Sequence, residues 1–191
     1  MTIASGDHIC AFFRGADQQD DILLPFLRDG LVAGHKCIAV MDDPDVEQIT
    51  NPLSLVLDVE THLRSGQFEL LSSVSAYITG GYFSTERMLD FWEYNVGRAV
   101  GKEGFPFVRS VGEMTWALRD IPGVDQLVRY EAQLNRFLPR YPQAVLCLYD
   151  LERFTDGSVL MEVLKSHPRV LMSGQVLDNP WYVELEDLLE V

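Results

Sequence analysis

The stretch that decides the fold is HICAFF at residues 8–13, followed by RGADQQDD at residues 14–21. The first six residues predict a buried strand, and residues 20–32 predict the helix that follows it. In a nucleotide-binding α/β protein, the turn between them would carry G-x-x-x-x-G-K-[ST], whose backbone N–H groups and lysine hold phosphates. This turn has one glycine, no lysine, no hydroxyl residue and three aspartates. We therefore expect that it binds no triphosphate.

The composition describes one globular domain over residues 1–191. The chain is 47% hydrophobic, which is ample for a core, and its net charge is −14. That charge argues against direct nucleic-acid binding and against an anionic membrane surface. The N-terminus lacks the pattern of a signal peptide, and no run of 18 apolar residues occurs, so we expect a cytoplasmic protein. The three cysteines are expected to be buried, reduced thiols.

Strand-like and helix-like segments alternate along the chain, which predicts an α/β fold with a mainly parallel sheet flanked by helices. A loop is expected at 72–83, and Pro52 is expected to end a short helix. The predicted strands are 8–13, 36–41, 68–71, 107–111, 144–149 and 170–172. The predicted helices are 20–32, 44–50, 55–64, 124–138 and 157–166, with one more from Ser84 to a stop at 104–106.

Ligands of open α/β sheets bind beyond the carboxyl ends of the strands. Glu113 has such a position, where an ATPase of the RecA type holds its metal-binding acid. The alternative is that Glu113 caps a turn or pairs with an arginine. The full set of residues at predicted strand ends is Arg14, Asp42, Asp43, Gly112, Glu113, Trp116, Asp150 and Arg153.

Glu131 is the second acid of interest, because it shares an apolar helix face with Leu127 and Leu134. A buried carboxylate is costly unless it is paired. It either contacts an arginine, such as Arg109 or Arg153, or lines a polar pocket. The alternative is that the helix rotates it to the rim of the core.

His8 and Cys10 are two residues apart on a strand and point to one face. Together with His167 they could form a metal site, but the spacing is not that of a zinc-ligand motif. Our interpretation is that the chain has no metal site, that His8 is hydrogen-bonded at the strand start and that Cys10 lies in the core. The sequence lacks the G-x-S-x-G, H-E-x-x-H, C-x-x-C and G-x-G-x-x-G patterns. We expect no catalytic residue and no cofactor, and hence no enzyme.

Several short fragments stand in a fixed order along the chain. They are GDHIC at 6–10, PFL at 25–27, GL at 30–31, GHKC at 34–37, GEMTWA at 112–117, YE at 130–131, YDL at 149–151, HP at 167–168 and NPWY at 179–182. Their order and spacing, from Gly6 to about Tyr182, resemble those of the MEDS family, a group of sensory domains.

The resemblance implies a RecA/KaiC-like three-layer sandwich without a working Walker A loop. It also implies a signal-input module that senses a small, hydrocarbon-like ligand. Family members occur alone or joined to DNA-binding, histidine-kinase or anti-sigma domains, so a protein output partner or a fused output domain is expected.

Our leading hypothesis is a non-enzymatic sensory module whose ligand binds near the carboxyl ends of the strands. Two alternatives stay open: a degenerate RecA-like nucleotide-binding protein, and a pure protein-interaction module that forms a homodimer. The residues expected to contact the ligand are His8, Cys10, Glu113, Trp116, Glu131 and Tyr149.

Overall fold

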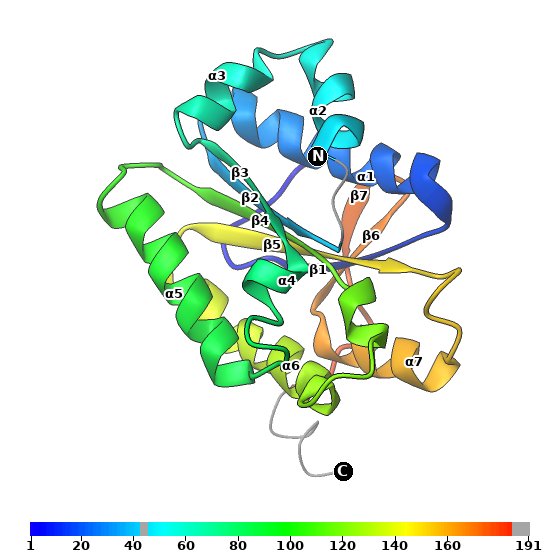
Figure 1. Cartoon of the computed structure of the whole chain (residues 1–191). Coiled ribbons are helices and arrows are strands. Elements are labelled where there is room, and N and C mark those ends of the chain that lie inside the picture. Colours follow the sequence, from blue (N-terminus) through cyan, green and yellow to red (C-terminus); the bar gives the residue numbers. More distant parts are fainter. Residues whose placement is uncertain (43–45, 185–191) are drawn as a thin grey trace.

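The fold is built on a seven-stranded sheet in the order β3-β2-β4-β5-β1-β6-β7 (Figure 1). The computed structural model describes residues 1–42 and 46–184. All neighbouring strands pair in parallel except β6 and β7, which are antiparallel. The strands are β1 (His8–Phe13), β2 (Lys36–Met41), β3 (Phe68–Ser72), β4 (Val108–Glu113), β5 (Gln143–Asp150), β6 (Arg169–Met172) and β7 (Gln175–Asp178).

Helices cover both faces of the sheet, so the predicted α/β three-layer architecture is confirmed (Figure 1). One face carries α1 (Gly15–Val32), α2 (Val46–Ser54) and α3 (Val59–Arg64). The other carries α4 (Ser73–Ala76), α5 (Thr85–Gly101), α6 (Leu127–Phe137) and α7 (Gly157–Ser166), together with the 3-10 turns η1 (Thr115–Leu118), η2 (Val124–Gln126) and η3 (Leu138–Arg140). No helix in the described ranges is long and apolar enough to cross a membrane.

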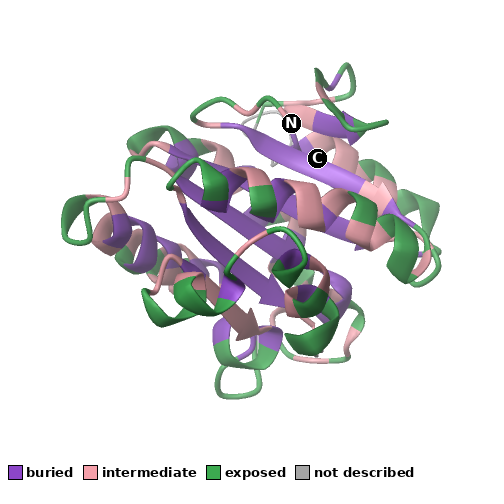
Figure 2. Ribbon diagram, turned by 90° about the horizontal axis from the view of Figure 1, so that it is seen from above, coloured by how far each residue is buried: buried purple, intermediate pink, exposed green. Residues whose placement is uncertain are grey.

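Two apolar cores lie on the two faces of the sheet, because successive strand residues point to opposite sides. On the side of α1, Ile9 and Ala11 of β1 pack with Phe26 and Leu27. On the side of α5, α6 and α7, Cys10 belongs to the second core. The buried strands lie between helices whose outer surfaces are exposed (Figure 2). This two-sided burial explains why the central strands are almost continuously apolar.

The N-terminal turn is shorter than predicted. Helix α1 begins at Gly15, whereas the sequence predicted a turn over 14–21. Arg14 has an extended backbone, and its N–H donates to Oε1 of Gln18 at 2.9 Å, one turn later. The Gln18 side chain thus accepts the backbone N–H of Arg14 next to the start of α1. In a phosphate-binding loop, backbone N–H groups at this place would bind the phosphate.

Helix α2 continues through Pro52 to Ser54, so the predicted break at Pro52 is wrong. Ile49 and Leu53 are buried against the core, and their packing holds the turn that contains the proline. Asp43 and Pro44, which were assigned from sequence to a strand end and a helix start, lie outside the described residues.

The sequence did not predict the 3-10 turn η1, the helix α4 or the strand β7. Helix α4 lies inside the expected 72–83 loop, and Ser72 caps it by accepting the N–H of Ser75 at 3.2 Å. Strand β7 follows a hairpin in which Ser173 and Gly174 both have positive φ. Its residues are mostly exposed, so they lack the apolar alternation that identifies a strand in sequence.

Candidate functional site

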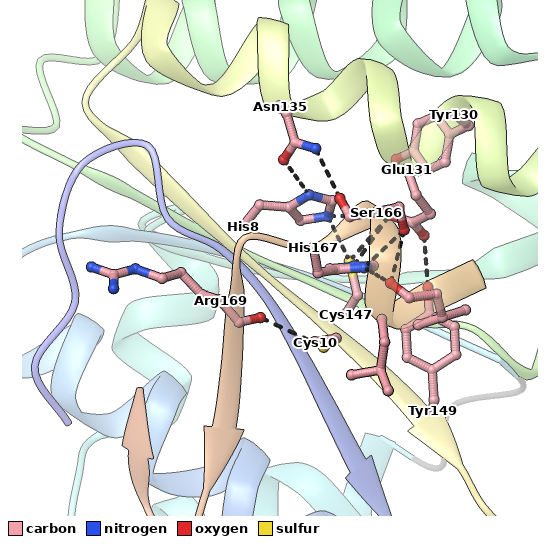
Figure 3. Close-up of polar contacts among 12 residues, drawn as sticks. His8, Cys10, Tyr130, Glu131, Asn135, Cys147, Tyr149, Ser166, His167 and Arg169 are labelled. Atoms are coloured by element: carbon pink, nitrogen blue, oxygen red, sulfur yellow. Dashed lines mark hydrogen bonds and ion pairs between the residues drawn. The ribbon is translucent and has the colours of Figure 1, made fainter. Parts of the chain in front are cut away.

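Four chemically reactive side chains meet between the sheet and α6 and form what we call the buried polar cluster: His8, Glu131, Cys147 and His167 (Figure 3). They come from β1, α6, β5 and the residue that ends α7. Cys147 is 2% exposed and the other three residues are 0% exposed. The cluster therefore joins four elements that are distant in the sequence.

The reactive atoms of the cluster point toward one another. Nε2 of His8 lies 3.1 Å from Oε2 of Glu131 and 3.6 Å from Sγ of Cys147. The same carboxylate oxygen lies 3.7 Å from Sγ of Cys147 and 3.5 Å from Nε2 of His167. All four ligand-type atoms lie within 4.8 Å of one another. This is a compact site with mixed nitrogen, oxygen and sulfur atoms.

An outer layer fixes the orientation of these groups. Nδ1 of His8 lies 2.8 Å from Oδ1 of Asn135, whose amide nitrogen donates to the carbonyl of Ser166. Nδ1 of His167 lies 2.7 Å from the carbonyl of Val163. Because both partner oxygens accept, each Nδ1 carries the proton and donates it. Each Nε2 then presents its lone pair to the cluster.

Burial sets the ionisation of the cluster. It lowers the pKa of His8 to about 4 and the pKa of His167 to about 3, so both imidazoles are neutral near pH 7. Burial also raises the pKa of Glu131 and holds the pKa of Cys147 well above its usual value. The Tyr149 hydroxyl donates to Oε1 of Glu131 at 2.9 Å. Sequence analysis offered Arg109 or Arg153 as contacts of Glu131, and the structure instead surrounds it with histidines, a thiol and a phenol.

Glu113 lies apart from this cluster, on the opposite face of the sheet. Its strand neighbour Val111 belongs to the core under α1, and alternation places Glu113 on the same side. Its carboxylate accepts the N–H of Asp42 at 3.2 Å, and both the N–H and the hydroxyl of Thr115, at 3.0 and 2.7 Å. Burial raises the pKa of Glu113. Its contacts with Thr115 are those of a residue that caps a turn, which was the alternative interpretation from sequence.

A cleft of about 240 Å³ opens beside Glu113, and we call it the edge cleft. It lies beyond the carboxyl ends of β1, β2, β4 and β5, next to the first turn of α1. Its charged lining residues are Asp20, Asp42, Glu113, Asp150 and Arg153. The described lining includes no lysine.

The other residues predicted as ligand contacts have different positions. Trp116 is fully buried in an aromatic group, stacked on Tyr77 at 4.8 Å and tilted against Phe83. Cys10 donates from Sγ to the carbonyl of Arg169 at 3.5 Å, outside the buried polar cluster. Of the predicted six, His8, Glu131 and Tyr149 meet at the buried polar cluster, Glu113 lines the edge cleft, Trp116 lies in the aromatic group, and Cys10 belongs to none of these.

Cys147 is the site residue that sequence reasoning missed, since it was interpreted only as a buried thiol. In the parallel pairing of β1 with β5, Cys10 is opposite Cys147. The sequence of β5 could have identified Cys147, because it is two residues before the predicted ligand contact Tyr149 and its side chain lies on the same face of the strand. Asn135, one turn after Glu131, was missed as well.

Similar proteins were found by sequence and by structure. Residues 7–168 match the model of the MEDS family, described as the methanogen/methylotroph, DcmR sensory domain. The transcriptional repressor DcmR of Methylorubrum extorquens is 33% identical over 171 residues. This match covers 87% of the chain and 60% of the repressor, so the chain spans about three fifths of that relative.

Two solved structures from Pyrococcus horikoshii share the fold. A KaiC-like protein has a TM-score of 0.58 at 10% identity, covering 87% of this chain and 70% of its own. An uncharacterized protein solved with an unknown peptide has a TM-score of 0.64 at 17% identity, covering 91% and 82%. The fold is therefore RecA/KaiC-like, and the sequence matches indicate a sensory, regulatory role. The chain belongs to the MEDS family of sensory domains.

Proposed function

We propose that this domain is the input module of a regulator, and that a small, hydrogen-bond-donating ligand binds in the edge cleft. The observation that carries the proposal is the charge of the cleft. It lies at the carboxyl edge of a RecA-like sheet, where such folds bind ligands, but four carboxyl groups line it beside one guanidinium. A triphosphate would meet like charge there, whereas a small amine would meet acceptors.

Crowding of acids strengthens this argument. Burial, together with the neighbouring carboxylates Asp17 and Asp21, raises the pKa of Asp20 at the cleft wall. A bound cation or hydrogen-bond donor would stabilise the ionised form of Asp20, because its positive charge offsets the repulsion between the neighbouring carboxylates. The three aspartates in the first two turns of α1 therefore favour a cationic ligand over a nucleotide.

Several other residues that line the edge cleft are apolar, which indicates that the ligand also has an apolar part. Phe13, Leu23, Met41 and Ile49 border the same cleft. The volume of about 240 Å³ is below that of typical drug-sized sites, which begin near 300 Å³. A short alkylamine combines these properties, with its ammonium group near the carboxylates and its carbon chain against the apolar residues.

A route for the signal begins at the end of β4. Asp42 accepts a hydrogen bond from Arg119 at 2.7 Å, and Glu113 holds the start of η1 through Thr115. The next residue in η1, Trp116, packs on Tyr77, which directly follows α4. A ligand that draws Glu113 away from Thr115 would favour a second position of η1. Signalling requires that the ligand bind the two positions with different affinity.

The output proposed for this module is transcription control, by analogy with the repressor to which the chain is similar. The rest of that relative extends beyond the matched region. In this proposal the domain regulates either a fused output domain or a separate protein partner. It binds no nucleic acid itself, since its net charge is −14.

A thermal-shift titration tests the proposal, with methylammonium, dimethylammonium and ethylammonium, and with Mg²⁺-ATP as the rival ligand. We expect at least one amine to raise Tm at millimolar concentration and Mg²⁺-ATP to leave it unchanged. Glu113→Gln should remove the amine response. Glu60→Gln is the matched control, because the Glu60 side chain is 84% exposed on α3.

Three outcomes would contradict the proposal. Micromolar binding of Mg²⁺-ATP would restore the nucleotide-binding alternative. The absence of stabilisation by every amine would remove the ligand class. A response that survives Glu113→Gln would place the ligand outside the edge cleft.

A further inference from the structure

The buried polar cluster contains more acceptors than donors at its centre. Nδ1–H of His8 and of His167 are directed away, to Asn135 and to the carbonyl of Val163. The two Nε2 lone pairs and Oε2 of Glu131 therefore face one another, and the Cys147 thiol, 3.7 Å from Oε2, is the donor directed at them. Nε2 of His167 has no hydrogen-bond partner among the described residues. An orphaned acceptor without access to water is costly, so this nitrogen calls for a group that accepts its electron pair.

The spacing of the four atoms fits a tetrahedral metal ion. Bonds of about 2.0 Å to nitrogen or oxygen and about 2.3 Å to sulfur place neighbouring ligands roughly 3.3–3.6 Å apart in a tetrahedron. The distances around Oε2 of Glu131 are 3.1 Å to His8, 3.5 Å to His167 and 3.7 Å to Cys147. The His8–Cys147 distance is 3.6 Å. The two remaining pairs, His167 with His8 and His167 with Cys147, lie within 4.8 Å, so a shift of the His167 ring toward the other three ligands would complete the site.

We propose that His8, Glu131, Cys147 and His167 bind one divalent transition-metal ion, with zinc as the preferred ion. Two imidazole nitrogens, a carboxylate oxygen and a thiolate are ligands that Zn²⁺ accepts in tetrahedral geometry. On binding, the Cys147 thiol loses its proton to solvent, and Glu131 binds as a carboxylate. These two negative charges balance the ion, so the loaded site is neutral, as a site without exposed surface requires.

The outer layer is already arranged as metal sites require. Ligating histidines usually donate their second N–H to a carbonyl or carboxylate, which fixes the ring. His8 does so to Asn135, and His167 does so to Val163. Tyr149 donates to Oε1 of Glu131 and leaves Oε2 directed at the centre (Figure 3). His8, His167 and Glu131 are thus oriented before an ion arrives.

This proposal replaces our interpretation from sequence that the chain has no metal site. The alternative weighed there combined His8 and His167 with Cys10, but the structure brings Cys147 to the cluster and turns Cys10 to the carbonyl of Arg169. The site is on the opposite face of the sheet from Glu113 and the edge cleft. The metal proposal therefore goes beyond ligand sensing in that cleft, and each proposal can fail alone.

Cobalt(II) is the probe that tests the site, because its spectrum reports both geometry and thiolate ligation. The full chain is unfolded in urea with a chelator and reductant, refolded with Co²⁺ and freed of excess ion, since all four ligands are at most 2% exposed in the folded chain. We expect about one ion per chain, the visible bands of tetrahedral Co²⁺ and a thiolate charge-transfer band. Stoichiometric Zn²⁺ should bleach both bands.

Two matched serine variants assign the sulfur ligand. Cys147→Ser should abolish the charge-transfer band and weaken binding on the order of 100-fold or more. Cys10→Ser, which changes the opposing thiol in the strand pair, should keep the band and the affinity. His167→Gln provides a second test that does not depend on the folding of Cys147→Ser, and it should weaken binding similarly.

The proposal is overturned by any of three results. One is a wild-type chain that refolds with less than a tenth of an equivalent of either ion. Another is an octahedral spectrum without the charge-transfer band. The third is a spectrum lost in Cys10→Ser but kept in Cys147→Ser. Zinc content measured by mass spectrometry gives an independent readout of the same stoichiometry.

Discussion

Nε2 of His8 lies 3.1 Å from Oε2 of Glu131, and both side chains are fully buried. The two residues are separated by 123 positions in the chain, so this contact ties β1 to α6. Glu131 also accepts the Tyr149 hydroxyl and lies next to the Cys147 thiol. One carboxyl group therefore connects the central strands to the helix that covers them.

Replacing Glu131 with alanine should destabilise the metal-free protein by about 3 kcal/mol, because its partners lose their hydrogen bonds without access to water. Urea unfolding followed by circular dichroism measures the change. Glu60→Ala, at an exposed i,i+4 pair with Arg64, should cost about 0.5 kcal/mol or less. Equal effects of the two substitutions would show that the Glu131 contacts add little to stability.

Gly112 is required because Tyr77 approaches β4 closely. A Cβ at this position would lie 2.4 Å from the Tyr77 hydroxyl oxygen and 3.3 Å from Sδ of Met114. Tyr77 is itself stacked on Trp116 and has little room to move. We expect Gly112→Ala to cost about 2 kcal/mol in unfolding experiments.

The control for Gly112 is Gly101, the last residue of α5. A Cβ there would meet nothing within 4 Å, and its φ is not positive. Gly101→Ala should therefore be neutral or stabilise the protein by about 0.5 kcal/mol. If both alanines were tolerated equally, the close contact between Gly112 and Tyr77 would not constrain the fold.

Much of the sheet could be predicted, because each central strand is an apolar run between turn residues. The run at 8–13 forms β1 with those bounds, and 36–41 forms β2. Two parts of the prediction were wrong for local reasons. The Gln18 side chain accepts the N–H of Arg14, and α1 begins at Gly15 and not at residue 20. The residues of β7 are mostly exposed and show no apolar alternation. The spacing of apolar residues in a sequence reflects which side chains are buried, so an edge strand with few buried side chains cannot be recognised from that spacing.

The candidate site was less predictable than the fold. Sequence reasoning singled out His8, Glu131 and Tyr149, which the structure does bring together. It also grouped them with Glu113, which lies on the other face of the sheet. Which residues meet depends on the order of the strands in the sheet and on the face to which each side chain points. The position of β5 beside β1 is not encoded in any short sequence motif. Cys147 was missed for this reason.

Ser84, the residue from which the sequence predicted this helix, is the N-cap of α5. Its hydroxyl oxygen accepts the backbone N–H of Arg87 at 3.3 Å. Ser84→Ala should lower the free energy of unfolding by about 1 kcal/mol. Ser84→Gly should lower it by only about 0.3 kcal/mol. Thermal or urea unfolding measures both. An alanine variant as stable as the glycine variant would argue against a role for the cap.

The three thiols should be unreactive in the folded protein. All three cysteines are buried and free, and burial raises the pKa of Cys10 and of Cys37 to about 12. Burial also raises the pKa of Cys147 well above its usual value. At pH 8, a thiol with a pKa near 12 is thiolate for only about one molecule in ten thousand, and thiolate is the nucleophile.

An Ellman assay at pH 8 should therefore detect almost no thiol in the native protein and three per chain in guanidinium chloride. Thr155→Cys supplies the positive control, since residue 155 is exposed and should react at once. Because reaction needs opening of the core, the slow native rate should rise with urea in parallel with unfolding. One thiol that reacts rapidly without denaturant would contradict the burial of that cysteine, and cysteine-to-alanine variants would identify it.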